Sequence, residues 1–76
     1  MRAIMSIEVA GKSTTAVIKS LHGIPELQSL HTTNGGWDLI AEIHADSLQD
    51  FDRVLRQVRE TEGVSSSETS ILLSSV

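Results

Sequence analysis

The 76-residue sequence contains no cysteine and no tyrosine, and it has one proline, one tryptophan and one phenylalanine. Without cysteine, disulfide bonds are excluded, and a zinc finger lacks its usual ligands. Only six lysines and arginines stand against ten acidic residues, and the net charge of −4 argues against a nucleic-acid-binding surface. Because no apolar run reaches about 18 residues, we expect no membrane-spanning segment and no membrane partner. A cytoplasmic protein is the resulting expectation.

The length predicts a single domain over residues 1–76. A domain this small buries a modest core, so its monomer is expected to have limited stability. Since disulfides and metal fingers are excluded, oligomerisation is the remaining common way to stabilise the fold. We therefore expect a homo-oligomer.

Four stretches have strand character, and we predict strands over 2–9, 26–32, 37–45 and 64–76. The first and third alternate, with one face wholly apolar and the other polar except for one isoleucine each, which is typical of half-buried strands. In the second, Leu27 and Leu30 are three residues apart, so neither face is clearly apolar, and we interpret it as a sheet edge. The fourth combines a serine-rich start with three consecutive aliphatic residues at 71–73.

Two stretches have helical spacing. The first begins at a cap, Ser13 or Thr14, and closes at His22–Gly23 before a proline. The second follows Ser47, which with Asp50 is close to a capping box, and it ends at Glu62–Gly63. Its apolar residues recur at helical spacing, which is the strongest helical signal in the chain: Leu48, Phe51, Val54, Leu55 and Val58.

The resulting order is β-α-β-β-α-β, and the two halves resemble each other weakly. This order predicts an α+β, ferredoxin-like sandwich with a four-stranded antiparallel sheet. Right-handed crossovers place both helices on one face of the sheet. The other face is left bare, with Ile4, Ile40 and Leu72 or their neighbours on it, so we predict that a second copy covers it in a dimer.

Residues 33–38, Thr-Asn-Gly-Gly-Trp-Asp, lie between the second and third strands. Asn34, Gly35 and Gly36 suit a hairpin turn, because these residues tolerate positive φ. Trp37 has two interpretations: it anchors the hairpin against the core, or it forms an aromatic wall beside a ligand or a subunit.

Catalytic and metal sites find little support. The candidate bases are His22 at a helix end and His31 and His44 on adjacent strands. His31 and His44 would supply two metal ligands, but no third ligand has a clear spacing. Because no nucleophile, base and orienting group converge, we predict no enzyme, no catalytic residue, no metal and no cofactor.

Hydroxyl groups cluster at 65–70, where five of six residues are serine or threonine. The stretch is either a plain polar loop or a set of donors, including Ser67 and Thr69, for a small polar molecule.

These features together resemble the effector-binding domain of the Lrp/AsnC family. The match comprises Ile24-Pro25-Glu26-Leu27 before the second strand, the turn at 33–39, the apolar anchors Phe51 and Leu55, and Gly63-Val64 followed by Ser67 and Thr69. It runs in register over nearly the whole chain. Ser67 stands where the family usually has threonine, and the doubled glycine shifts the turn motif by one residue. The helix-turn-helix that typically precedes this domain is missing, so the chain looks like a stand-alone form without direct DNA binding.

The resemblance implies a non-catalytic regulatory module that binds an amino acid or similar small effector. It also implies dimers that assemble into octamers or decamers, with effectors bound between dimers. The resemblance further implies a full-length Lrp/AsnC transcriptional regulator as a partner. By matching positions, the implied ligand-binding residues are Asn34, Gly35, Gly36, Trp37, Asp38, Ser67 and Thr69. The glycine turn would take a carboxylate, and Asp38 with the hydroxyls an ammonium group. The alternatives are a small dimeric α+β barrel enzyme and a purely structural assembly partner.

Overall fold

The structure is a computed structural model that describes residues 1–11 and 14–76. Six elements follow one another in the expected order: β1 (Arg2–Val9), α1 (Thr14–Leu21), β2 (Leu27–Thr32), β3 (Leu39–His44), α2 (Leu48–Glu60) and β4 (Val64–Ile71). The first strand has the predicted bounds. Of the two proposed caps of the first helix, Ser13 lies outside the described residues.

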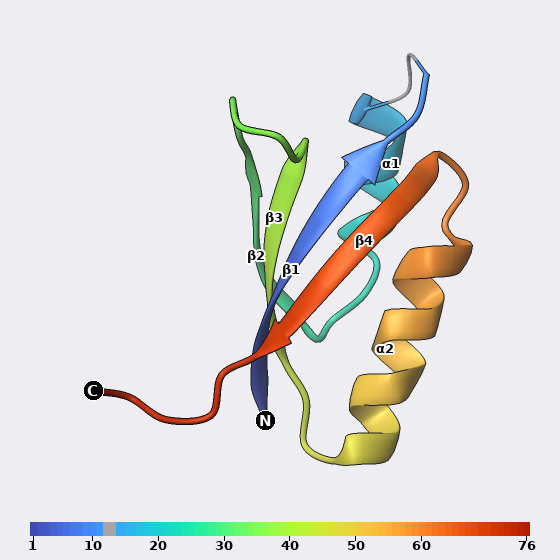
Figure 1. The fold of residues 1–76 in the computed structure, drawn as a ribbon. Helices are drawn as coiled ribbons and strands as arrows, with labels where there is room; N and C mark the ends of the chain where they lie inside the picture. Colours follow the sequence, from blue (N-terminus) through green and yellow to red (C-terminus); the bar gives the residue numbers. More distant parts are fainter. Residues whose placement is uncertain (12–13) are drawn as a thin grey trace.

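The strands form one antiparallel sheet in the order β2-β3-β1-β4. Both helices pack on the same side of this sheet, and the other side is left open (Figure 1). The predicted ferredoxin-like sandwich is therefore confirmed, and β2 is an edge strand as expected.

Three strands are shorter than predicted. The second begins at Leu27 instead of residue 26, and the third ends one residue early, at His44. The third begins at Leu39 instead of residue 37, because residues 33–38 form a turn closed by the Thr33 amide donating to the Asp38 carbonyl (3.1 Å). The fourth ends at Ile71 instead of residue 76. The Leu72 amide still donates to the Arg2 carbonyl (2.9 Å), and after it the chain turns away from the sheet (Figure 1).

The ambiguous spacing of the second strand has a structural cause. The register of β2 against β3 shifts between Leu27 and Ser29. Leu27 lies opposite Ile43 and Leu30 lies opposite Ala41, so both leucines occupy the helix-covered face despite being three residues apart. A β-bulge of this kind places two residues of one strand against one of its neighbour.

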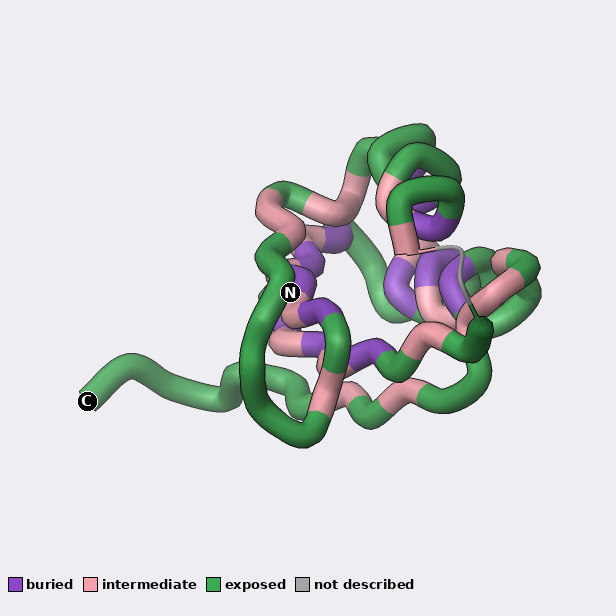
Figure 2. The backbone as a smooth tube through the Cα atoms, turned by 90° about the horizontal axis from the view of Figure 1, so that it is seen from above, coloured by how far each residue is buried: buried purple, intermediate pink, exposed green. Residues whose placement is uncertain are grey.

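The core lies between the helices and the two central strands, and Figure 2 shows the buried segments gathered there, with exposed segments outside. Alternation in β1 and β3 supplies most of it, because successive side chains of a strand point to opposite faces. The fully buried residues are Ala3, Met5, Ile7, Leu39, Ala41 and Ile43 from the sheet and Leu21, Val54 and Val58 from the helices.

Helix α2 is capped as predicted. The Ser47 hydroxyl accepts a hydrogen bond from the Asp50 amide (3.1 Å). The Asp50 carboxylate lies 3.8 Å from Arg53, so the cap is formed by the serine. The helix ends at Glu60, two residues earlier than expected, and the turn that follows contains Gly63 at a φ of +97°.

The open face of the sheet is mainly polar, with Ile4 and Ile40 half-buried at its centre. Leu72, predicted to share this face, follows the end of β4 and is 44% exposed. Neither helix in the described part of the chain is long and apolar enough to cross a membrane.

Candidate functional site

The turn at residues 33–38 joins β2 to β3 at one end of the sheet (Figure 1). Its first half is held by the Thr33 hydroxyl, which accepts a hydrogen bond from the Gly35 amide (3.0 Å). Its second half is held by Asp38, whose amide donates to the Ile7 carbonyl (3.0 Å). The residues between are exposed, except that Trp37 is half-buried. The turn is therefore fixed at both ends and open in the middle.

Three backbone amides of this turn are free. In the described part of the chain, the N–H groups of Asn34, Gly36 and Trp37 donate to no other residue. A Cβ added at Gly36 would meet no atom within 4 Å, so the backbone there is open to an approaching group. Unpaired N–H groups in a turn are suited to an anion such as a carboxylate.

Ser67 and Thr69 lie on β4, on the far side of β1. Ser67 and Leu39 both pair with Ile7, and Thr69 and Ala41 both pair with Met5. The two hydroxyl residues therefore belong to the helix-covered face, and both are half-buried. The Thr69 hydroxyl oxygen is buried and has no hydrogen-bond partner among residues 1–11 and 14–76.

One copy of the chain does not bring the two parts of the predicted site together. Two strand spacings, about 9–10 Å, separate the backbone of Ser67 from that of Leu39, where the turn ends. Two grooves on the described surface lie away from both parts, one along the outer side of α2 and one between Met1–Arg2 and residues 72–75.

A charged cluster that the sequence did not predict lies on the open sheet face. Arg2 donates to Glu42 (2.6 Å), and the Nε2 atom of His44 lies 3.1 Å from the Glu42 carboxylate and 3.3 Å from the Nε atom of Arg2. The hydrogen bonds from Arg2 and then from His44 lower the pKa of the Glu42 carboxyl. His31 is on the same face, opposite Ile40, but no three His, Asp or Glu side chains in residues 1–11 and 14–76 gather closely enough to hold a metal ion.

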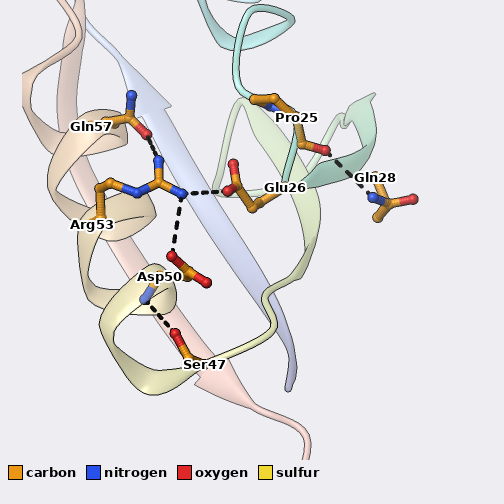
Figure 3. Close-up of polar contacts among 7 residues, drawn as sticks. All are labelled: Pro25, Glu26, Gln28, Ser47, Asp50, Arg53 and Gln57. Atoms are coloured by element: carbon orange, nitrogen blue, oxygen red, sulfur yellow. Dashed lines mark hydrogen bonds and ion pairs between the residues drawn. The ribbon is translucent and has the colours of Figure 1, made fainter.

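A second charged cluster connects α2 to the start of β2 (Figure 3). Arg53 contacts the Glu26 carboxylate, the Gln57 side chain (2.8 Å) and, more distantly, Asp50. Arg56 pairs with Asp52 (2.8 Å). Two of the three arginines on this helix therefore have carboxylate partners within the chain.

Two further residues support the turn and were not among the predicted ones. Thr33 is detectable from sequence, because threonine before Asn-Gly often accepts a hydrogen bond from the amide two residues on. Val9 is not, since its amide meets the Asp38 carboxylate (2.7 Å) across 29 positions of the chain.

The β-α-β-β-α-β sandwich and its hairpin turn define a class of small α+β domains. The family model that describes the sequences of the Lrp/AsnC ligand binding domain matches residues 2–76. The chain therefore belongs to the Lrp/AsnC family, as the resemblance in its motifs predicted.

Curated relatives are longer than this chain. It is 30% identical over 60 residues to a homocitrate synthase of Sulfurisphaera tokodaii, covering 79% of this chain and 13% of that protein. It is 29% identical over 73 residues to an uncharacterised helix-turn-helix transcriptional regulator of Pyrococcus abyssi, covering 95% of this chain and 46% of that protein. The chain thus spans less than half of the length of either relative.

Solved structures share the fold. Escherichia coli AsnC matches with a TM-score of 0.91 at 18% identity, covering 97% of this chain and 51% of that one. A feast or famine regulatory protein from M. tuberculosis, in complex with L-methionine, matches with a TM-score of 0.82 at 20% identity, covering 97% and 50%.

Proposed function

We propose that this domain binds an amino acid or a similar small effector, without catalysing a reaction, and that it does so as an oligomer. The observation that carries the proposal is the set of three free amides on a turn that is fixed at both ends. These donors suit the carboxylate that every amino acid presents. The L-methionine complex of the M. tuberculosis relative supports an amino acid as the ligand class.

The proposed site includes Asn34, Gly35, Gly36, Trp37 and Asp38. Ser67 and Thr69 complete it in the assembly rather than in one chain, because β1 separates them from the turn. The unpaired Thr69 hydroxyl supports a role for β4 in binding, since a buried hydroxyl without a partner is unfavourable. A site completed between copies links ligand binding to assembly, because the ligand then favours the assembled state.

The proposed dimer forms through the open sheet face. The molecule extends 36 × 25 × 17 Å, so its broad side is large enough for the roughly 800 Å² that each partner buries in a standard interface. Ile4 and Ile40 lie at the centre of this face with charged residues around them. Assembly of dimers into octamers or decamers, and association with a full-length Lrp/AsnC regulator, extend the same proposal.

A thermal-shift screen of the twenty amino acids tests ligand binding. A ligand at a hundredfold excess over its Kd adds about 2.7 kcal/mol to the stability. For a domain of this size, that raises the Tm by about 10 °C or more. If no amino acid raises the Tm at millimolar concentration while the protein stays oligomeric, the purely structural alternative replaces the effector-binding proposal.

Two further measurements test the site and the assembly. Backbone NMR titration with the best ligand should shift the amides of residues 34–38 and of Ser67 and Thr69, and shifts confined to other residues would show that the site is misplaced. Light scattering should give at least twice the mass of one chain at micromolar concentration. A single-chain mass would contradict the dimer.

A further inference from the structure

Asp38 ends the turn and makes more long-range hydrogen bonds than its neighbours. Its amide donates to the Ile7 carbonyl (3.0 Å), and its carboxylate oxygen Oδ2 accepts from the Val9 amide (2.7 Å). Its carbonyl accepts from the Thr33 amide (3.1 Å) on the opposite arm of the turn. A single residue thus connects the end of β1, the start of β3 and the first arm of the turn.

The Asp38 carboxylate takes the place of a backbone hydrogen-bond acceptor between β1 and β3. Strand β3 starts at Leu39, which pairs with Ile7, and before Leu39 the chain leaves β1 to form the turn. No β3 carbonyl is left to accept the Val9 amide. Asp38 supplies a side-chain oxygen as the acceptor instead. This bond extends the contact between β1 and β3 from Ile7 to Val9.

The pairing of β1 with β4, on its other side, is irregular next to the same residue, Val9. The register against β4 shifts between Glu8 and Val9, and Ser65 is the extra residue. The Ser65 hydroxyl donates to the Glu8 carbonyl (3.2 Å). Beyond the bulge the ladder to β4 resumes, since Val9 pairs with Val64 and the Ala10 amide donates to the Gly63 carbonyl (2.8 Å). On the side of the turn, the Asp38 carboxylate is the group that holds the Val9 amide.

We infer that Asp38 is a positioning residue: its bond to the Val9 amide sets the orientation of the turn, and with it the free amides of Asn34, Gly36 and Trp37. Its contribution to binding acts through the turn backbone instead of through an ion pair with the ammonium group of the ligand. This inference rests on the proposed function for its consequence in binding, while the bond itself is independent of any ligand. It revises the role that the sequence indicated for this carboxylate.

Two substitutions separate position from charge. Asp38→Asn keeps a carbonyl oxygen that can accept from the Val9 amide and removes the negative charge, whereas Asp38→Ala removes both. Asp46→Asn and Asp46→Ala are matched controls, because Asp46 is an exposed aspartate that makes no hydrogen bond with the described residues. The first measurement is amide hydrogen exchange of Val9, which needs no ligand.

Asp38→Ala should speed the exchange of the Val9 amide by about tenfold, the effect of losing a hydrogen bond to a charged acceptor. Asp38→Asn should recover most of the protection, and the Asp46 variants should leave it unchanged. Unchanged exchange in Asp38→Ala, or equal loss in Asp38→Asn, would overturn the inference.

The second measurement is the affinity for L-methionine by calorimetry. Asp38→Ala should weaken binding at least about tenfold, whereas Asp38→Asn should stay within a few-fold of the wild-type protein. If Asp38→Asn keeps the Val9 protection but loses binding as Asp38→Ala does, the carboxylate contacts the ligand directly, and the inference is wrong. If the wild-type protein binds no amino acid, the proposed function fails, and the exchange measurement still decides whether Asp38 positions the turn.

Discussion

Gly63 is the position where one added methyl group should damage the fold most directly. It lies in the turn between α2 and β4 with a φ of +97°, a conformation that other residues rarely adopt. A Cβ built there would lie 2.6 Å from the Cγ2 atom of Val17, which is 1% exposed and belongs to the core. Gly63→Ala therefore strains the backbone and crowds a buried side chain at once.

The magnitude follows from these two effects. A non-glycine residue held in such a conformation costs about 1–3 kcal/mol, and an extra methyl group in a packed core costs about 1–3 kcal/mol more. We expect a loss of about 2–6 kcal/mol against a total stability of about 4–11 kcal/mol for a chain of this length. Even the lower value lowers the Tm by about 8–16 °C.

Thermal and urea unfolding, followed by far-ultraviolet circular dichroism at equal protein concentration, measure this loss. Gly36→Ala is the matched control, because Gly36 has no positive φ and a Cβ there meets no atom within 4 Å. It should stay within about 0.5 kcal/mol of the wild-type protein. If Gly63→Ala is equally mild, the close contact with Val17 does not exist in solution, and the reasoning is refuted.

Three further predictions concern the core, a helix cap and the open sheet face. Phe51→Ala should lose about 3–5 kcal/mol in urea unfolding, because Phe51 is 3% exposed, whereas Leu48→Ala on the same helix, at 67% exposure, should change little. Equal losses would contradict the burial of this face of α2 against the sheet. Ser47→Ala should lose about 1 kcal/mol of stability, whereas Ser47→Asp should keep the stability of the wild-type protein. Equal stability of the two variants would show that the cap makes no contribution. Arg2 and His44 lower the pKa of the Glu42 carboxyl in the folded state. The ionised carboxylate therefore stabilises the fold above its ordinary pKa of 4.5, and this stabilisation is lost as the pH falls through the lower folded-state pKa. Glu42→Gln should therefore flatten the fall in urea midpoint below pH 4.5, and an unchanged profile would show that the cluster does not affect stability.

Local patterns in the sequence determined most of the fold. Alternation over Arg2–Val9 predicted the bounds of β1 and which of its residues are buried, because the period of a strand directly sets the face of each side chain. The spacing in Leu48–Glu60 and the Ser47 cap predicted α2 in the same way. The element order then led to the sandwich, and the motifs led to the family.

The candidate site was predicted less completely. Asn-Gly-Gly indicated an exposed turn, and the structure has one at 33–38, but the expected reason is wrong, because Asn34, Gly35 and Gly36 do not adopt positive φ. That Ser67 and Thr69 lie on the helix-covered face, two strands from the turn, depends on the pairing of β1 with both neighbours. Whether these residues meet in an assembly is set by contacts between chains, which local patterns do not contain.

Only the tertiary structure decided which residues far apart in the chain contact one another. The bulge in β2 places Leu27 and Leu30 on one face, although their spacing of three residues does not fit strand alternation. The Asp38 carboxylate meets the Val9 amide across 29 positions, so a residue that looked like a ligand contact supports the backbone. The periodicity of a sequence reports the local conformation of the chain, whereas the partner of a polar side chain depends on how the elements pack. The sequence alone therefore predicted the turn, and the packing of β1 against β3 decided how that turn is held.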